Sequence, residues 1–259
     1  MKNVRKYGKA PFTVAVIHGG PGASGDMAPV AKELSQSHGI LEPLQTSTTI
    51  QGQLQELSRI IKNNGDPPLT FIGHSWGAWL TILYAARYPS EVKKIILVSS
   101  GPFEEKYVSQ IMETRLGRLN DKEQIHLRTL LHGLNNPAGR NKNQMFAQLG
   151  KILTHADSFL PLRQNEKNVT FQYNIFHHVW KEADDLRRSG KLLEIVSQLQ
   201  CLVVAIHGDY DPHPFEGVEK PLSKIVKDFK FILLKNCGHY PWIEKNAKES
   251  FYNILFREL

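Results

Sequence analysis

Short, almost entirely apolar stretches recur along the chain, and they constrain its fold more than any other feature of the sequence. The clearest are Phe12–Ile17, Leu69–Ile72, Lys94–Val98, Leu202–Ile206 and Phe229–Leu234, with a weaker candidate at Ile40–Gln45. A strand with one face in water alternates apolar and polar residues, and these stretches lack that alternation. They are typical of strands in a parallel sheet that helices cover on both faces.

Helical patterns lie between these predicted strands. The segment Thr49–Asn64 has apolar residues at positions 50, 54, 57, 60 and 61, which places them on one side of a helix. Trp76–Arg87 is apolar almost all round, as a buried helix is, and helices are also expected at Gly217–Lys227 and Glu244–Leu259. Strands that alternate with helices predict an α/β fold with a mostly parallel central sheet flanked by helices.

The region 102–198 differs from the rest of the chain. It lacks β-branched runs, is rich in Gln, Asn, Lys, Arg and Leu, and is interrupted by several glycines and prolines. We interpret it as a helical cap inserted between two strands of one sheet. The core would then consist of residues 1–101 and 199–259.

Composition narrows the classes of protein. A chain of 259 residues is near the upper limit for one hydrophobic core. The net charge is +7, but beyond residue 9 the basic residues are mixed with acidic ones, so no nucleic-acid-binding face is expected.

No apolar run approaches the ~18 residues of a membrane span. The apolar run near the start is too short for a signal peptide, so we expect a cytoplasmic protein with no membrane partner. Cys201 and Cys237 are too few for a disulfide framework.

Polar residues follow the predicted strands directly. The segments after four of them are His18–Gly22 (HGGPG), Gly73–Gly77 (GHSWG), His207–Pro212 (HGDYDP) and Asn236–Trp242 (NCGHYPW). Sites in open α/β sheets form beyond the carboxyl ends of the strands, so a serine, an acid and a histidine should meet at one edge. A serine hydroxyl needs a base within hydrogen-bond reach to act as a nucleophile, and His239 is the candidate base for Ser75.

The motif G-x-S-x-G on a strand-to-helix turn, with the chain order Ser, Asp, His, resembles the α/β-hydrolase fold superfamily. HGGPG followed by GHSWG most resembles its proline iminopeptidase branch and esterase-like relatives, and the resemblance covers the chain except for the cap. It implies Ser75 as nucleophile and His239 as base. It also implies Asp211, three residues after Gly208, as the orienting acid. The oxyanion hole would use the backbone amides of Gly20 and Trp76.

Several other polar groups could fill these roles. Asp209 is the alternative acid, although its place in the turn favours bonds to backbone amides, and Glu104 and Glu105 follow another strand. His207, Asp209, Asp211 and His213 resemble metal ligands, as does the pair His177–His178. They lie in a tight loop without the spacing of a metal motif on a helix, so no metal and no cofactor are expected.

A serine nucleophile implies acyl transfer to water, with a small ester, thioester or lactone as substrate. The first alternative is an aminopeptidase of the proline iminopeptidase type. Enzymes of that branch bind the substrate amine with cap glutamates, one of them in a Trp-x-x-Trp-Glu-like segment. This chain offers only Val179-Trp180-Lys181-Glu182, which departs from that pattern. A second alternative is a receptor that retains the pocket without catalysis.

Overall fold

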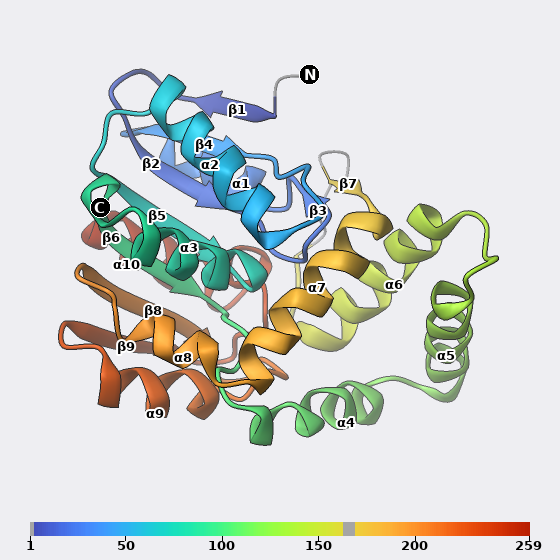
Figure 1. The fold of residues 1–259 in the computed structure, drawn as a ribbon. Coiled ribbons are helices and arrows are strands. Elements are labelled where there is room, and N and C mark those ends of the chain that lie inside the picture. Colours follow the sequence, from blue (N-terminus) through green and yellow to red (C-terminus); the bar gives the residue numbers. More distant parts are fainter. Residues whose placement is uncertain (1–2, 163–168) are drawn as a thin grey trace.

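The predicted strands lie together in one seven-stranded sheet, in a computed structural model that describes residues 3–162 and 169–259 (Figure 1). The strand order is β1-β4-β2-β5-β6-β8-β9. β1 runs antiparallel to β4, and the other neighbouring strands are parallel. The strands are β1 (Val4–Tyr7), β4 (Gly39–Pro43), β2 (Phe12–Ile17), β5 (Leu69–His74), β6 (Val92–Val98), β8 (Leu202–Gly208) and β9 (Phe229–Leu234).

The central strands are buried on both faces, as their sequences predict. In β2, Val14 and Val16 pack into the hydrophobic cluster on one face of the sheet, and Ala15 and Ile17 pack into the cluster on the other. All four side chains are buried. The absence of apolar–polar alternation in this strand therefore reflects helices on both sides of the sheet.

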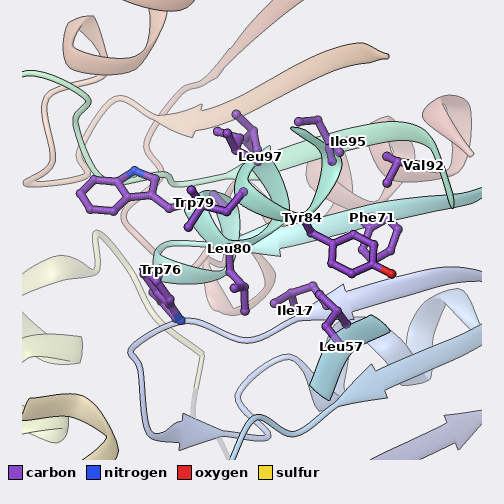
Figure 2. Packing of buried hydrophobic residues seen from close by; sticks show 14 of the residues in the cluster. Ile17, Leu57, Phe71, Trp76, Trp79, Leu80, Tyr84, Val92, Ile95 and Leu97 are labelled. Atoms are coloured by element: carbon purple, nitrogen blue, oxygen red, sulfur yellow. The ribbon is translucent and has the colours of Figure 1, made fainter. Parts of the chain in front are cut away.

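Helices cover each face. The residues of α1 (Ala28–Leu34) and α10 (Lys248–Glu258) join the cluster on one face. The cluster on the other face takes residues from four helices: α2 (Ile50–Asn64), α3 (Trp76–Arg87), α8 (Lys191–Val196) and α9 (Glu216–Ile225). Figure 2 shows Tyr84 of α3 beside Phe71 of β5, and their ring centroids are 5.1 Å apart. The predicted buried helix 76–87 is confirmed.

Between β6 and β8 the described chain is mainly helical. Its elements are a short 3₁₀ turn (Glu105–Tyr107), α4 (Ser109–Arg118), α5 (Asp121–Asn135), α6 (Lys142–Asp157), β7 (Thr170–Phe171), α7 (Tyr173–Arg188) and α8. We call residues 102–198 the cap, and 163–168 within it lie outside the described residues. α4 to α6 stand to one side of the sheet in Figure 1, whereas residues of α7 and α8 pack into the core cluster. The division of the chain at residues 102 and 198 stays a prediction.

The sequence did not predict every element. The edge strand β1, helix α1 and the two-residue strand β3 (Ala23–Ser24), which pairs with β7, were not expected. The predicted helix 244–259 is wrong at its start, because a 3₁₀ turn (Pro241–Ile243) precedes it and α10 begins at Lys248. Glu244 binds backbone amides outside the helix, as described below, and this holds its segment away from α10.

Two smaller expectations concern membranes and thiols. Among the helices of the described residues, none has the length and apolar character that a membrane span requires. Cys201 and Cys237 are both free.

Candidate active site

Ser75 lies at a sharp turn between β5 and α3. Its backbone has φ 52° and ψ −115°, a left-handed conformation that costs a non-glycine residue about 1–3 kcal/mol. The amide of Ser75 donates a hydrogen bond to the carbonyl oxygen of Val98 at the end of β6, at 3.0 Å. The strained turn is therefore anchored to the neighbouring strand, and Ser75 lines a cavity at this edge of the sheet.

Two glycines leave room for the turn. A Cβ on Gly73 would lie 2.3 Å from the carbonyl oxygen of Gly77, so it would force β5 and α3 apart. A Cβ on Gly77 would lie 2.3 Å from the carbonyl oxygen of Ile17, so it would push α3 away from β2. Both glycines of GHSWG are thus required by close backbone approach, as the sequence indicates.

His239 and Asp211 form a buried pair at the same edge. The Nδ1 atom of His239 lies 2.7 Å from Oδ2 of Asp211. Burial alone would raise the pKa of Asp211, but the imidazoles of His239, His213 and His207 outweigh it and hold that pKa well below its ordinary value. Asp211 is therefore ionised at neutral pH, and its carboxylate orients the ring of His239.

The other candidate acids bind elsewhere. Asp209 accepts a hydrogen bond from the amide of Cys237 at 3.3 Å, as its place in the turn suggests. Glu104 contacts Lys106 at 3.0 Å, and Glu105 contacts Arg187 at 3.1 Å. Of these carboxylates only that of Asp211 is hydrogen-bonded to His239.

The HGGPG segment turns sharply beside Ser75. Gly20 has φ 36° and lines the cavity together with Trp76, the first residue of α3. The first amides of a helix have no partner within the helix and attract negative charge. The amide of Gly19 donates to both carboxylate oxygens of Asp26, at 3.1 and 3.3 Å. This bond fixes the peptide between His18 and Gly19, next to the peptide that carries the Gly20 amide.

A second histidine shares the acid. Nδ1 of His213 lies 2.8 Å from Oδ1 of Asp211, and its ring stacks on that of His239 with centroids 4.5 Å apart. Within the described part of the chain, Asp211, His213 and His239 offer ligand atoms within 4.8 Å of one another. The two rings are nearly parallel, at 29°, and both Nδ1 atoms bind the carboxylate. Hydrogen bonds to the carboxylate of Asp211 thus account for the contacts within this group.

The remaining histidines singled out in the sequence lie in other surroundings. His207 is buried, and its Nε2 lies 2.9 Å from the carbonyl oxygen of His213. His18 is buried with Nδ1 2.8 Å from the carbonyl oxygen of Gly19. On α7, Nδ1 of His178 meets the carbonyl oxygen of Asn174 in its own helix at 2.8 Å, and the ring of His177 packs against that of His178.

A cavity of about 450 Å³ connects the sheet edge to the cap. The core contributes Gly20, Ser75, Trp76 and His239 to its lining. The cap contributes an apolar wall made of Met112, Leu131, Phe146, Leu149, Leu153, Phe171, Phe176 and Trp180. Phe176 and Trp180 stack at 9° with centroids 6.2 Å apart, so α7 presents aromatic faces in series along this side. The arrangement suits a substrate with a substantial apolar group.

An ion pair interrupts the apolar wall. Arg115 of α4 binds Asp157 at the end of α6 through two parallel hydrogen bonds, of 2.7 and 2.6 Å. Both side chains line the cavity, and both are largely buried. The charge of Asp157 is therefore neutralised within the protein.

The cap holds the loop that carries His239. The amide of His239 donates to the carbonyl oxygen of Asp157 at 2.8 Å. The carboxylate of Glu244 is fully buried and accepts hydrogen bonds from Phe159 and Leu160, both at 2.7 Å, and from Gly238 at 2.9 Å. The end of α6 and the histidine loop are consequently fixed to each other.

The structure thus brings together the five residues named from the sequence: Gly20, Ser75, Trp76 and His239 line one cavity, and Asp211 binds His239. Sequence reasoning missed Asp26, the Arg115–Asp157 pair and the role of Glu244. The sequence pattern indicates His213 only as a possible metal ligand, although its position two residues after Asp211 is also compatible with a hydrogen bond between them. No local pattern marks Glu244, whose partners are backbone amides, or Asp26, which binds a backbone amide and His74.

A strained serine on a strand-to-helix turn, beside a histidine–aspartate pair at the edge of a parallel sheet, defines the type of site found in α/β hydrolases. The model of the family described as alpha/beta hydrolase fold matches residues 42–246. The chain belongs to this family and is a hydrolase, as the sequence motifs indicate.

Curated proteins and solved structures agree with this assignment. The chain is 32% identical over 258 residues to the proline iminopeptidase of Saccharolobus solfataricus, covering 90% of this chain and 81% of that protein. It is 22% identical over 247 residues to Lipase 1 of Psychrobacter immobilis, covering 88% and 71%. The structure of Est816, an N-acyl homoserine lactone degrading enzyme, shares the fold with a TM-score of 0.65 at 15% identity, covering 99% of this chain and 95% of that one.

Proposed function

We propose that the protein is a serine hydrolase that cleaves small carboxylic esters, thioesters or lactones by acyl transfer through Ser75, His239 and Asp211. The observation that carries this proposal is the strained backbone of Ser75 at a cavity that His239 also lines, with His239 bound to Asp211 at 2.7 Å. Strain of this kind is retained where function requires it.

In the first half of the reaction, Oγ of Ser75 attacks the carbonyl carbon of the substrate while Nε2 of His239 takes the hydroxyl proton. The ionised Asp211 holds Nδ1–H of His239, so that Nε2 is the free base and the imidazolium is stabilised once it forms. The amides of Gly20 and Trp76 donate to the oxyanion of the tetrahedral intermediate. One such donor is worth about 3–4 kcal/mol to catalysis.

In the second half, the imidazolium of His239 gives its proton to the leaving alcohol or thiol, and the acyl group stays on Ser75. A water molecule then attacks this acyl ester, again with His239 as base, and the carboxylic acid leaves as Ser75 regains its proton. The net reaction consumes one water and releases an acid and an alcohol or thiol. It uses only groups of the chain and its substrate.

The cavity favours esters over peptides with a free amine. The acids that line it within the described residues are Asp26 and Asp157, and both already have partners in the protein. Glu182, the glutamate of the Val179–Glu182 segment, lies outside this lining, and its carboxylate accepts from the amide of Ile50 at 2.8 Å. An ammonium group would therefore find no unpaired carboxylate among these side chains.

An aminopeptidase of the proline iminopeptidase type is the alternative, because a relative of that name is 32% identical. A receptor without catalysis is the second alternative. The three functions differ in what Ser75 does and in which substrate is turned over.

The test begins with a fluorophosphonate probe, which reacts with an activated serine. We expect stoichiometric labelling of the wild-type chain at Ser75 and no labelling of Ser75→Ala. Ser109→Ala, at the first residue of α4, is the control and should be labelled like the wild type. A folded wild type that resists the probe, or labelling that survives Ser75→Ala, would contradict catalysis and favour a receptor.

The substrate class is tested with p-nitrophenyl esters of increasing chain length beside aminoacyl-naphthylamides that include the prolyl one. We expect ester turnover with a preference for acyl chains long enough to reach the aromatic wall, and no amide turnover. Faster cleavage of the prolyl naphthylamide than of every ester would establish the peptidase alternative.

A further inference from the structure

Asp26 lies between the three loops that carry the proposed catalytic groups. Its carboxylate accepts hydrogen bonds from the amide of Gly19 at 3.1 and 3.3 Å, and its Oδ2 lies 3.3 Å from Nδ1 of His74. His74 is the residue before Ser75, and its Nε2 lies 3.0 Å from the carbonyl oxygen of His239. One chain of contacts therefore joins the HGGPG segment, the serine turn and the histidine loop.

His74 is held on both sides of its ring. A carbonyl oxygen only accepts, so Nε2 of His74 donates to the carbonyl oxygen of His239. Nδ1 of the same ring faces Oδ2 of Asp26. Burial lowers the pKa of His74 below its ordinary value, although the hydrogen bond to Asp26 partly opposes that shift. Asp26 and the histidine loop thus hold the ring of the residue that precedes Ser75.

The packing leaves this pair little freedom. The ring of His74 is buried, with the rings of His239 and Trp242 at centroid distances of 4.8 and 4.7 Å. A Cβ on Gly19 would lie 2.5 Å from Nδ1 of His74 and 3.0 Å from Oδ2 of Asp26. The HGGPG backbone therefore packs closely against His74 and Asp26. A substitution of Asp26 is expected to shift the peptide next to Gly20.

We propose that Asp26 is a positioning residue for acyl transfer: it binds the Gly19 amide and His74, and so fixes the direction in which the Gly20 amide points. This inference rests on the proposed function. Asp26 acts mainly on the transition state, because it holds the backbone beside the Gly20 amide, which donates to the oxyanion. Its loss lowers kcat and leaves KM nearly unchanged.

The test compares Asp26→Asn with Asp66→Asn. Asp66 accepts a hydrogen bond from the amide of Phe12 at 2.7 Å, so it binds a backbone amide at the opposite end of the same strand, β2. For Asp26→Asn we expect kcat on a p-nitrophenyl ester to fall about 10- to 100-fold, part of the effect of losing one oxyanion donor, with KM within about threefold. Asp66→Asn should keep kcat within about twofold.

A trifluoromethyl ketone, which forms a tetrahedral adduct with an active serine, gives a second readout. Its inhibition constant should rise for Asp26→Asn by the same factor by which kcat falls, since both report on the oxyanion. Thermal unfolding of each variant measures any loss of stability separately. If Asp26→Asn does not fold, Asp26→Ser takes its place with the same expected result, because the side chain is partly exposed, at 17%.

Hydrogen exchange separates this inference from the proposed function. The amides of residues 18–20 and 22 should exchange faster in Asp26→Asn than in the wild type, whether or not the wild type hydrolyses any ester. Inactive wild-type protein with this change would refute the proposed function alone. Unchanged exchange, a kcat within about twofold of wild type, or an equal loss of kcat in Asp66→Asn would overturn the role of Asp26.

Discussion

The buried carboxylate of Glu244 offers a sharp test of how the cap and the histidine loop are joined. In Glu244→Gln, the remaining side-chain oxygen can still accept from the amides of Gly238 and Phe159, which both bind Oε1 in the wild type. The new NH₂ group then faces the amide of Leu160, which binds Oε2 at 2.7 Å in the wild type. The NH₂ group and the Leu160 amide are both donors, so the hydrogen bond between Leu160 and the charged carboxylate is lost. Because the site is buried, no water replaces it.

Losing a hydrogen bond to a charged group costs about 1.5–3 kcal/mol, and a buried unpaired donor adds to that cost, so we expect the free energy of unfolding to fall by about 2–4 kcal/mol. For a chain of this size each kcal/mol lowers Tm by about 2–4 °C, which gives a decrease on the order of 10 °C. Because Gly238 precedes His239, kcat should also fall at least about tenfold, the scale expected when a catalytic group is misplaced by a fraction of an ångström.

Glu56→Gln provides the matched control. Glu56 is a buried carboxylate that accepts from the amides of Thr46 and Ser47, at 2.9 and 3.0 Å, far in sequence from the histidine loop. Its substitution should keep kcat within about twofold of wild type. It should lower Tm less than Glu244→Gln does, because the new NH₂ group can donate to the hydroxyl of Thr46. Thermal unfolding and ester turnover measure both variants. A normal kcat in Glu244→Gln, or an unchanged Tm, would refute the reasoning.

Other variants test the elbow and the buried acids. Gly77→Ala should lower kcat about a hundredfold, because its Cβ would lie 2.3 Å from the oxygen of Ile17 and shift the serine turn; Gly117→Ala, with nothing within 4 Å, should not. Glu42→Gln should raise Tm at pH 8 but not at pH 4. Burial raises the pKa of Glu42 to about 7, so the wild type loses stability as pH rises from about 4.5 to 7, whereas glutamine stays neutral throughout. Equal Tm shifts at both pH values would argue against this. Asp211→Asn should be less stable than wild type above about pH 4, with the difference in Tm shrinking at lower pH as the depressed carboxylate of Asp211 gains its proton. A gap that persists to pH 2 would count against it.

Much of the core follows from local sequence signals. The run Phe12–Ile17 is apolar throughout, and this pattern predicts a strand buried on both faces. In the structure its alternate side chains pack against helices on opposite faces of the sheet, so the signal can be read from the strand's own sequence. Gly73 and Gly77 indicate close backbone approach in the same way. The parallel arrangement itself brings the residues that follow each strand to one edge of the sheet, so the sequence alone predicts that Ser75 and His239 lie there.

The contacts that the sequence did not predict join distant segments. Arg115 and Asp157 meet only because α4 packs against α6, and no periodicity in either segment encodes that pairing. Glu244 was expected to begin a helix because its neighbours have helical spacing. Its carboxylate binds amides 84 and 85 residues away instead, and this tertiary interaction outweighs the local preference.

The cap leaves the sheet after β6 and returns to it at β8, and these two strands are direct neighbours. An insertion between adjacent strands changes neither the order nor the register of the sheet. In addition, the entropy of closing such a loop grows slowly, by about 0.6 kcal/mol for a doubling of its length. Helices α4 and α5 could therefore be exchanged for a segment of another size with little effect on the folding of the core. A chimaera must keep the segment 157–162, which holds the histidine loop, and also α7 and α8, whose residues pack into the core cluster.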